Sequence, residues 1–464
     1  MTKFSSKSTL KLEAPSITVT VIVIGALLVG YLLTMLSAVH SFLLVILLLI
    51  SVCVFIWPEA GLYLVIFSML LSPEIIAGDI GGKATLGRGL TLRLEDFLLL
   101  SIGLSWFART AVDKTTGLFH KTPLNQPIAA YVLACFVATL WGTVTGDVEG
   151  FAGFFFVLKY FEYIIVFFMV VNYVNTEDQA KRLLFCLFLT CFIVSIYGLI
   201  QIPGGGRVSA PFEGQSGEPN TFGGYLVFMG ALAMALIDHL KNMRVRLGLA
   251  ILLVVLLISL AYTQSRASYL AVIPAYLAVS FFSPRRVYLW AALILAIVLG
   301  PLIVPQVAKE RVAFTFNQRK AQGQIQIGRL RLDTSASARI VSYKEALSNW
   351  RNKPILGYGV TGIGFMDAQY ARVLVETGII GMLAFAWLVY SLFLVGLGTW
   401  REHQEGLLHG LSVGLISGLV GLLVHAIGAN TFIIVRIMEP FWFLTGIVIA
   451  LAAMDEESRE VSAI

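Results

Sequence analysis

The stretch from Leu247 to Thr263 has the sequence LGLAILLVVLLISLAYT and decides the fold. All but a few of its residues are apolar, and Arg246 and Arg266 bracket it on its two sides. A helix needs about 20 predominantly apolar residues to cross the hydrocarbon core of a bilayer. The stretch therefore predicts a membrane-spanning helix with basic residues at its ends.

The same pattern recurs along most of the chain. Apolar residues make up 58% of the 464 residues and charged residues only 13%, which excludes an ordinary soluble enzyme of this length. We predict an all-α polytopic membrane protein of about 14 transmembrane helices with a long helical extracytoplasmic loop. The predicted spans lie near 17–37, 41–57, 61–78, 97–109, 127–144, 151–173, 183–202, 221–238, 247–263, 268–283, 287–305, 373–398, 409–428 and 440–454.

The basic residues of the short loops predict the orientation, because cytoplasmic loops retain Lys and Arg. If the basic N-terminus lies inside and precedes a retained first span, five basic connections lie inside too. They carry Arg109, Lys114 and Lys121; Lys181 and Arg182; Lys241, Arg244 and Arg246; Arg285 and Arg286; and Arg401. The chain then divides into helices 1–11 over 1–305, an extracytoplasmic basic loop with amphipathic helices over 306–372, and helices 12–14 with a cytoplasmic tail over 373–464.

The four cysteines offer no metal or redox motif. Cys53, Cys135, Cys186 and Cys191 all fall in apolar stretches, without the paired spacing of a zinc or redox site. We interpret them as packing residues inside the membrane.

The predicted outside loop 306–372 is strongly basic. It holds eleven Lys or Arg residues against four acidic ones, a net charge of +7, more than the +6 of the whole chain. Long loops largely escape the positive-inside bias, so insertion permits this excess without explaining it. Fixed guanidinium groups beside a low-dielectric membrane can bind phosphate-bearing ligands. The alternative is attraction to anionic lipid headgroups.

An amphipathic helix is predicted inside this loop from Ser337 to Trp350. Its apolar residues recur at spacings of three and four, which is the stripe of a helix lying on the membrane surface or over a cavity. Arg339 falls in its first turn, off the stripe. Ser335 or Ser337 could cap the helix, and Asn352-Lys353-Pro354 would end it.

The run Gly357-Tyr-Gly359-Val-Thr-Gly362 matches the dinucleotide pattern G-x-G-x-x-G, but we reject a nucleotide site. That fingerprint follows a strand and opens a helix in a βαβ unit, whereas this run follows a predicted helix and a proline. We predict a flexible, closely packed turn instead.

Polar residues at the outer ends of the spans are candidates for chemistry. Arg266 follows the opening stretch with no acid beside it, and an arginine at the membrane rim indicates either a site with a partner or a snorkelling side chain. Asp367 is either a helix cap or a general base. Arg372 and Glu376 are four apart and can pair along a helix. Before another span, Glu218-Pro219-Asn220 has the pattern of a proline turn with an Asn cap.

Four elements, taken in order, resemble the O-antigen ligase and polymerase superfamily of bacterial membrane glycosyltransferases. They are Glu218-Pro219-Asn220, Ser265-Arg266-Ala267-Ser268, Arg339 ahead of Asn352-Lys-Pro-Ile-Leu-Gly-Tyr-Gly359, and the run from Tyr370 to Glu376-Thr-Gly378. The resemblance implies a multi-pass protein of the bacterial inner membrane with its active site on the extracytoplasmic face. It also implies transfer of glycan from undecaprenyl pyrophosphate to a glycan or lipid acceptor, with neither metal ion nor cofactor.

The resemblance assigns roles to particular residues. By position, Arg266 and Arg339 match the family's pair of arginines that hold the donor pyrophosphate. The candidate pyrophosphate ligands are Arg266, Arg339, Arg207 and Arg93, and the candidate catalytic residues are Asp367 and Glu218. Ligases of this superfamily that load lipid A core usually have a His where this chain has Asp367. That difference favours a polymerase of lipid-linked repeat units into a surface polysaccharide.

Two alternatives stay open. One is a ligase that transfers glycan to lipid A core or to protein. The other, from a different class, is a solute transporter, for which an internal repeat and charges near the bilayer midplane are expected. We find no repeat, and the midplane candidates are Lys159, Glu162 and His425, of which the first two are predicted to pair. Expected partners are the lipid-linked donor, the glycan acceptor, membrane lipids and a possible chain-length regulator, but no nucleic acid.

Overall fold

The protein is described by a computed structural model over residues 37–76, 91–112, 120–213, 217–327, 330–364 and 366–463. Its helices are α2 (Ala38–Ile56), α3 (Pro58–Leu71), α4 (Leu94–Val112), α5 (Asn125–Val144), α6 (Gly150–Tyr173), α7 (Glu177–Gln201), α8 (Pro219–His239), α9 (Met243–Tyr262), α10 (Arg266–Phe282), α11 (Arg286–Ile303), α12 (Gln306–Asn317), α13 (Thr334–Asn352), α14 (Gln369–Glu402), α15 (Leu407–His425) and α16 (Val435–Ala463). Two short antiparallel hairpins accompany them, β1 (Glu74–Ile76) with β2 (Thr91–Arg93) and β3 (Gln326–Ile327) with β4 (Leu330–Arg331).

The helical membrane architecture predicted from the sequence is confirmed. Within the described ranges, eight helices are long and apolar enough to cross a membrane, namely α5, α6, α7, α8, α9, α14, α15 and α16. Shorter apolar helices lie within α2, α3, α10 and α11. The first predicted span, 17–37, falls almost entirely outside the described residues, and the count of fourteen stays a prediction.

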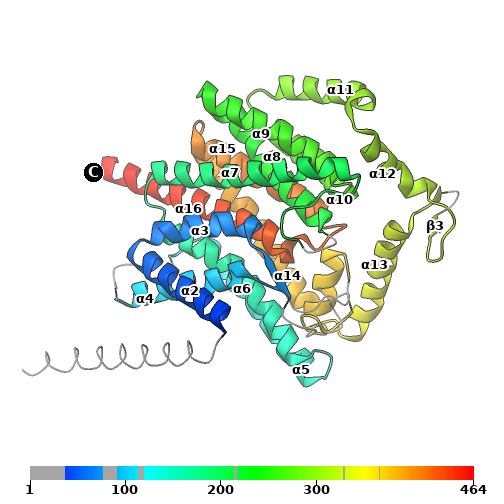
Figure 1. The fold of residues 1–464 in the computed structure, drawn as a ribbon, viewed down its shortest axis with the longest axis horizontal. Helices are drawn as coiled ribbons and strands as arrows, with labels where there is room; N and C mark the ends of the chain where they lie inside the picture. The colour runs from blue at the N-terminus through cyan, green and yellow to red at the C-terminus, as the bar shows by residue number, and fades with distance from the viewer. Residues whose placement is uncertain are drawn as a thin grey trace, which may run out of the picture.

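Helix α8 is the centre of the bundle, and glycines let α15 approach it closely. An added Cβ would lie 2.6 Å from Leu232 at Gly414, and 2.6 Å from Phe228 at Gly418. Membrane helices associate through such small residues because lipid supplies no hydrophobic force between them. Figure 1 shows α7, α8, α9, α15 and α16 running side by side along the long axis. This packing holds the N-terminus of α8, which carries part of the candidate site.

The loops predicted to lie on opposite sides of the membrane gather at opposite ends of this bundle. The N-termini of α10, α13 and α14 lie at the end where α12 and α13 project, and the C-terminus of α16 lies at the other (Figure 1). At that other end, the predicted cytoplasmic loops contact one another through Lys241 and Glu405, whose charged atoms lie 2.5 Å apart. Which end faces the cytoplasm stays a prediction from the basic loops.

The predicted amphipathic helix is present as α13 and begins three residues earlier than expected. It ends at Asn352, before Lys353 and Pro354, as predicted. The cap is Asp333, whose carboxylate accepts from the Ala336 N–H at 3.0 Å, so the expectation of a cap at Ser335 or Ser337 was wrong. Ser337 lies inside the helix, where its hydroxyl accepts from the N–H of Ile325. The buried carboxylate of Asp333 therefore caps α13 and also pairs with Arg266, as described below.

Helix α14 is broken at Gly378, and backbone groups of the segment before α14 supply hydrogen bonds that the break removes from the helix. Gly378 has φ 64° and ψ −164°, so the backbone groups around it lose their partners within the helix. Tyr358 N–H donates to the Val375 carbonyl at 3.0 Å, and Gly359 N–H donates to that of Glu376 at 2.8 Å. In return, Ile379 N–H donates to the Pro354 carbonyl at 2.9 Å. The G-x-G-x-x-G run is therefore a closely packed turn, as predicted.

A buried ion pair ties the turn to α14 from the side. Arg372 and Glu376 lie 3.0 Å apart and are both buried, which confirms the predicted pair. The same Glu376 oxygen accepts from the N–H of Thr361 at 3.0 Å. Asp367 lies just outside this braced region and starts the segment that enters α14.

Gly378→Ala is expected to destabilise the protein by about 3 kcal/mol or more. Its backbone region costs a non-glycine residue about 1–3 kcal/mol, and an added Cβ would lie only 2.2 Å from the carbonyl oxygen of Ile355. Gly398→Ala is the matched control on α14, because its added Cβ would meet no atom within 4 Å. Thermal unfolding in detergent should show a large loss for the first variant and none for the second. Equal melting temperatures would refute this account of the break.

Candidate functional site

The candidate site is built around the turn from Thr263 to Arg266, between α9 and α10. Gln264 adopts a left-handed φ of 53°, and Ser265 caps α10 by accepting from the Ser268 N–H. The turn lets the chain reverse at the end of α9 while two main-chain carbonyls, those of Thr263 and Gln264, point outward as acceptors. Both carbonyls are used by arginines.

Two arginines from distant segments bind these carbonyls. Arg207, which precedes α8, donates from Nε to the Thr263 carbonyl at 3.0 Å. Arg311, on α12, donates from Nε to the Gln264 carbonyl at 3.2 Å. Since Arg266 follows in the same turn, three guanidinium groups lie around one short segment. These contacts orient Arg207 and Arg311 through their Nε groups.

Arg266 has the acidic partner that the sequence left unnamed. Its Nη1 lies 2.7 Å from Asp333 Oδ2 and donates to the hydroxyl of Thr315 at 2.7 Å. Asp333 is 1% exposed and also caps α13, so one carboxylate joins α10 to α13. Among the described residues, the buried Nη2 group of Arg266 has no hydrogen-bond partner.

Arg339 approaches from α13 and meets Asp367. Its Nη2 lies 3.7 Å from Asp367 Oδ2, and its Nη1 donates to the Ser335 hydroxyl at 3.4 Å. Its Nε is buried and has no hydrogen-bond partner within the described ranges of the chain. Gly428, after α15, packs beside Arg339, since a Cβ there would lie 3.4 Å from this Nε. The 3.7 Å separation makes the contact between Arg339 and Asp367 a long one.

Crowding of like charge makes this end of the molecule electropositive. Burial, together with the charges of Arg311, Arg266 and Arg339, lowers the pKa of Arg207 to about 10. Burial also lowers the pKa of Arg311, with Arg266 and Arg339 adding to the effect. The helices α8, α10, α13 and α14 all begin at this end, and helix N-termini carry partial positive charge. An anion bound among the four arginines would relieve this repulsion.

Two carboxylates border the arginines. Partial burial raises the pKa of Asp367, Arg339 and Arg372 oppose that rise, and the carboxylate of Glu218 adds to it. Glu218 directly precedes α8, where its carboxylate accepts from the Thr221 hydroxyl at 2.8 Å. The structure thus brings both predicted catalytic residues to the arginine cluster.

Neither residue proposed as a cap has that role. The N-cap of α14 is Ala368, so Asp367 lies one residue before the cap with its side chain directed to Arg339. Asn220 lies inside α8, whose N-cap is Glu218 and whose first residue is Pro219. Its side-chain oxygen accepts from Arg207 Nη2 at 3.2 Å. The expected Asn cap was therefore wrong, because proline already occupies the first helical position.

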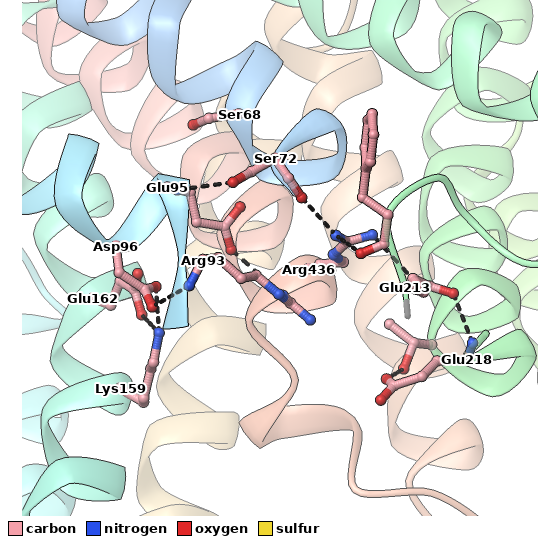
Figure 2. Close-up of polar contacts among 12 residues, drawn as sticks. Ser68, Ser72, Arg93, Glu95, Asp96, Lys159, Glu162, Glu213, Glu218 and Arg436 are labelled. Carbon is pink, nitrogen blue, oxygen red and sulfur yellow. Dashed lines mark hydrogen bonds and ion pairs between the residues drawn. The ribbon is translucent and has the colours of Figure 1, made fainter. Parts of the chain in front are cut away.

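Arg93, the fourth candidate pyrophosphate ligand, pairs with an acidic residue of α4. It lies in β2, and its Nη1 is 3.5 Å from Glu95 at the start of α4. Figure 2 shows this pair among buried polar residues that include Ser72 and Arg436. The role of Arg93 as a pyrophosphate ligand stays a prediction.

The sequence reasoning missed Arg311 and Asp333. Both were counted only in the net charge of the loop. Their spacing from Arg266 carries no signal along the chain, although an acid directly before a predicted helix was a recognisable cap. In the described part of the chain, no three His, Cys, Asp or Glu side chains are placed to hold a metal ion.

Comparison with models of known protein families gives a match over the middle of the chain. No curated protein matches the chain. The family model described as O-antigen ligase matches residues 251–386, from within α9 to within α14. The matched segment contains Arg266, Arg311, Arg339 and Asp367, whereas Arg207 and Glu218 lie outside it. The match confirms the resemblance stated from the sequence: over residues 251–386, the chain is similar to the O-antigen ligase family.

Proposed function

We propose that the protein is a glycosyltransferase that polymerises oligosaccharide repeat units carried on undecaprenyl pyrophosphate. One observation carries the proposal: four arginines converge at one end of the helix bundle, and two of them keep buried N–H groups that have no partner among the residues the structure describes. Bidentate guanidinium groups suit phosphate oxygens better than point charges do. The family match supports glycan transfer as the reaction class.

The arginines are assigned to the leaving group. When the bond between the anomeric carbon and the phosphate oxygen breaks, the electron pair stays on the pyrophosphate and its charge grows. Arg266 and Arg339 would meet that charge with groups already oriented by Asp333 and Ser335. Stabilisation by preorganised charges is strong where water is scarce.

Asp367 is assigned as the base. The acceptor hydroxyl attacks the anomeric carbon, and its proton passes to the Asp367 carboxylate as the new glycosidic bond forms. The pKa of Asp367 is raised above its ordinary value, which makes it a better proton acceptor than an exposed aspartate. Glu218 contributes to that rise and faces the same region. The step uses no oxidant, and it needs no co-reactant besides donor and acceptor.

The acceptor separates polymerase from ligase. Asp367 replaces the His usual in ligases of lipid A core, and this favours a second lipid-linked glycan as acceptor. The description of the matched family favours the ligase alternative, with lipid A core or protein as acceptor. We place the reaction on the extracytoplasmic face of the bacterial inner membrane, because the basic loops predicted as cytoplasmic lie at the opposite end of the bundle. Control of chain length by a partner remains a prediction.

Reconstitution with a lipid-pyrophosphate oligosaccharide tests the proposal. Purified protein in liposomes should release undecaprenyl pyrophosphate and lengthen the lipid-linked glycan without other proteins. Lipid A core and a protein acceptor are offered in parallel. Transfer to either of these alone would establish the ligase instead, and no release with any acceptor would refute glycan transfer from this donor.

A further inference from the structure

Arg436, at the start of α16, is the largest side chain that the structure buries completely, with 0% exposure. Its Nη1 donates to the Pro211 carbonyl at 2.8 Å, and its Nη2 donates to those of Ser72 and Phe212 at 3.1 and 3.2 Å. These acceptors are main-chain groups of two segments, one after α3 and one before α8. A guanidinium group fans out to several acceptors in fixed directions, so it joins the two segments rigidly.

Glu213 continues this contact toward the candidate site. Its carboxylate is 1% exposed, with Oε1 lying 3.6 Å from Arg436 Nη1. Its other oxygen, Oε2, accepts from the main-chain N–H of Glu218 at 2.8 Å. Figure 2 shows the path from Arg436 through Glu213 to Glu218. One buried carboxylate thus connects the arginine of α16 to the backbone of a candidate catalytic residue.

The backbone next to these contacts is strained. Phe212 has a left-handed φ of 60°, which is uncommon for a bulky residue. Its side chain is 52% exposed, so core packing does not hold it there. Such strain persists only where surrounding contacts over-determine it, and it concentrates near functional sites. Here the main-chain hydrogen bond from Arg436 supplies such a contact.

We propose that Arg436 and Glu213 are positioning residues that hold the chain before α8, so that Glu218 faces Asp367. This inference rests on the proposed function, since it concerns the same site. Both residues lie outside the segment matched by the family model, which ends at residue 386 on one side and begins at 251 on the other. The helix that closes the bundle therefore takes part in aligning the acceptor side of the site.

The ionisation of Glu213 should make turnover depend on pH. Burial raises the pKa of Glu213 to about 8, Arg436 opposes the rise, and the neighbouring charges of Glu218 and Arg93 act on it as well. Within the described part of the chain, these three charged groups act on Glu213. Once ionised, Glu213 pairs with Arg436 and accepts from the Glu218 N–H with a full negative charge. Turnover should therefore rise as pH increases through about 8, because the ionised form holds the segment more firmly.

Two substitutions test the role. Glu213→Gln keeps the size of the side chain but offers one acceptor where Glu213 faces two donors. Arg436→Lys keeps the charge and loses the fan of donors. In each variant, kcat should fall about tenfold to a hundredfold, the scale of loss when a reacting group shifts by about 1 Å. The KM for the lipid-linked donor should stay unchanged, and Glu213→Gln should abolish the inflection near pH 8. Arg459→Lys, 55% exposed on the same helix, is the matched control.

A double-mutant cycle with Glu218→Gln separates positioning from general stability. If Arg436 acts through Glu218, Arg436→Lys should cost nothing further in a protein that already carries Glu218→Gln. Hydrogen exchange of the unliganded protein gives a readout independent of activity: the amides of 208–213 and 217–218 should lose protection in Glu213→Gln. Additive kinetic losses, or unchanged protection, would overturn the proposal. Absence of glycan transfer by the wild type would refute the proposed function, while the exchange result would still decide on the positioning.

Discussion

Arg266→Lys and Arg339→Lys are each expected to lower kcat about 100-fold to 1000-fold, the usual cost of removing one preorganised donor to a developing charge. Lysine preserves the positive charge, so simple attraction of the donor survives. It loses the fork that serves two oxygens at once. Arg266→Lys removes the buried Nη2 group and Arg339→Lys removes the buried Nε group, and neither group has a hydrogen-bond partner among the described residues. Turnover of the lipid-linked donor by reconstituted protein is the measurement.

Arg319→Lys is the matched control for these variants. Arg319 lies in the same basic loop and is exposed, so its replacement should leave turnover unchanged. All three variants should insert normally and show the same melting temperature in detergent. Activity near the wild-type level in both Arg266→Lys and Arg339→Lys would remove these residues from the transfer step and leave the loop as a contact for anionic lipids.

Asp367→Asn is expected to lower kcat about 100-fold to 10,000-fold, the range that a positioned general base contributes. The amide retains the size of the side chain and cannot take up the proton. In the wild type, kcat/KM should rise with pH through the raised pKa of Asp367, because only the ionised carboxylate acts as base. Asp367→Asn should lose this limb of the profile. A variant with undiminished turnover would exclude Asp367 as the base.

Glu218→Gln tests whether Asp367 is the group responsible for the rise of kcat/KM with pH. The negative charge of Glu218 helps to raise the pKa of Asp367, so its removal should move the limb to lower pH. Neutralising Arg339, whose positive charge acts in the opposite sense, should move the limb to higher pH. Glu310→Gln, an exposed carboxylate of the same loop, should leave the profile in place. If the pH dependence of kcat/KM stays unchanged in both the Glu218 and the Arg339 variants, it reports the ionisation of a group other than Asp367.

Much of the local structure was predictable because it depends on neighbours along the chain. The apolar runs predicted membrane helices, the stripe around Tyr343 predicted α13, and the four-residue spacing predicted the pair of Arg372 with Glu376. Each feature depends on helical periodicity or the length of a span, both of which are read from adjacent residues. The motifs around Arg266 and Arg339 also carried the family resemblance.

Other features depended on contacts between distant segments. Asp333 was predictable as a loop residue, but its pairing with Arg266 brings together positions 67 residues apart. Arg311 joined the site only because α12 returns to the turn after α9. Arg93 lies in β2 and pairs with Glu95 at the start of α4, a contact that the sequence did not predict. Arg436 gave no signal at all, since an arginine near the start of a span ordinarily suggests snorkelling.

The sequence alone determined that this chain lives in a membrane, which of its loops are basic, and that its central motifs resemble a glycan-transferring superfamily. Those properties follow from composition and short-range order. The tertiary structure decided which arginines share one site, which carboxylate each one meets, and that α16 braces the chain ahead of Glu218. Electrostatic energy depends on the distance between charges in space, and in a helix bundle that distance is set by packing between helices rather than by separation along the chain.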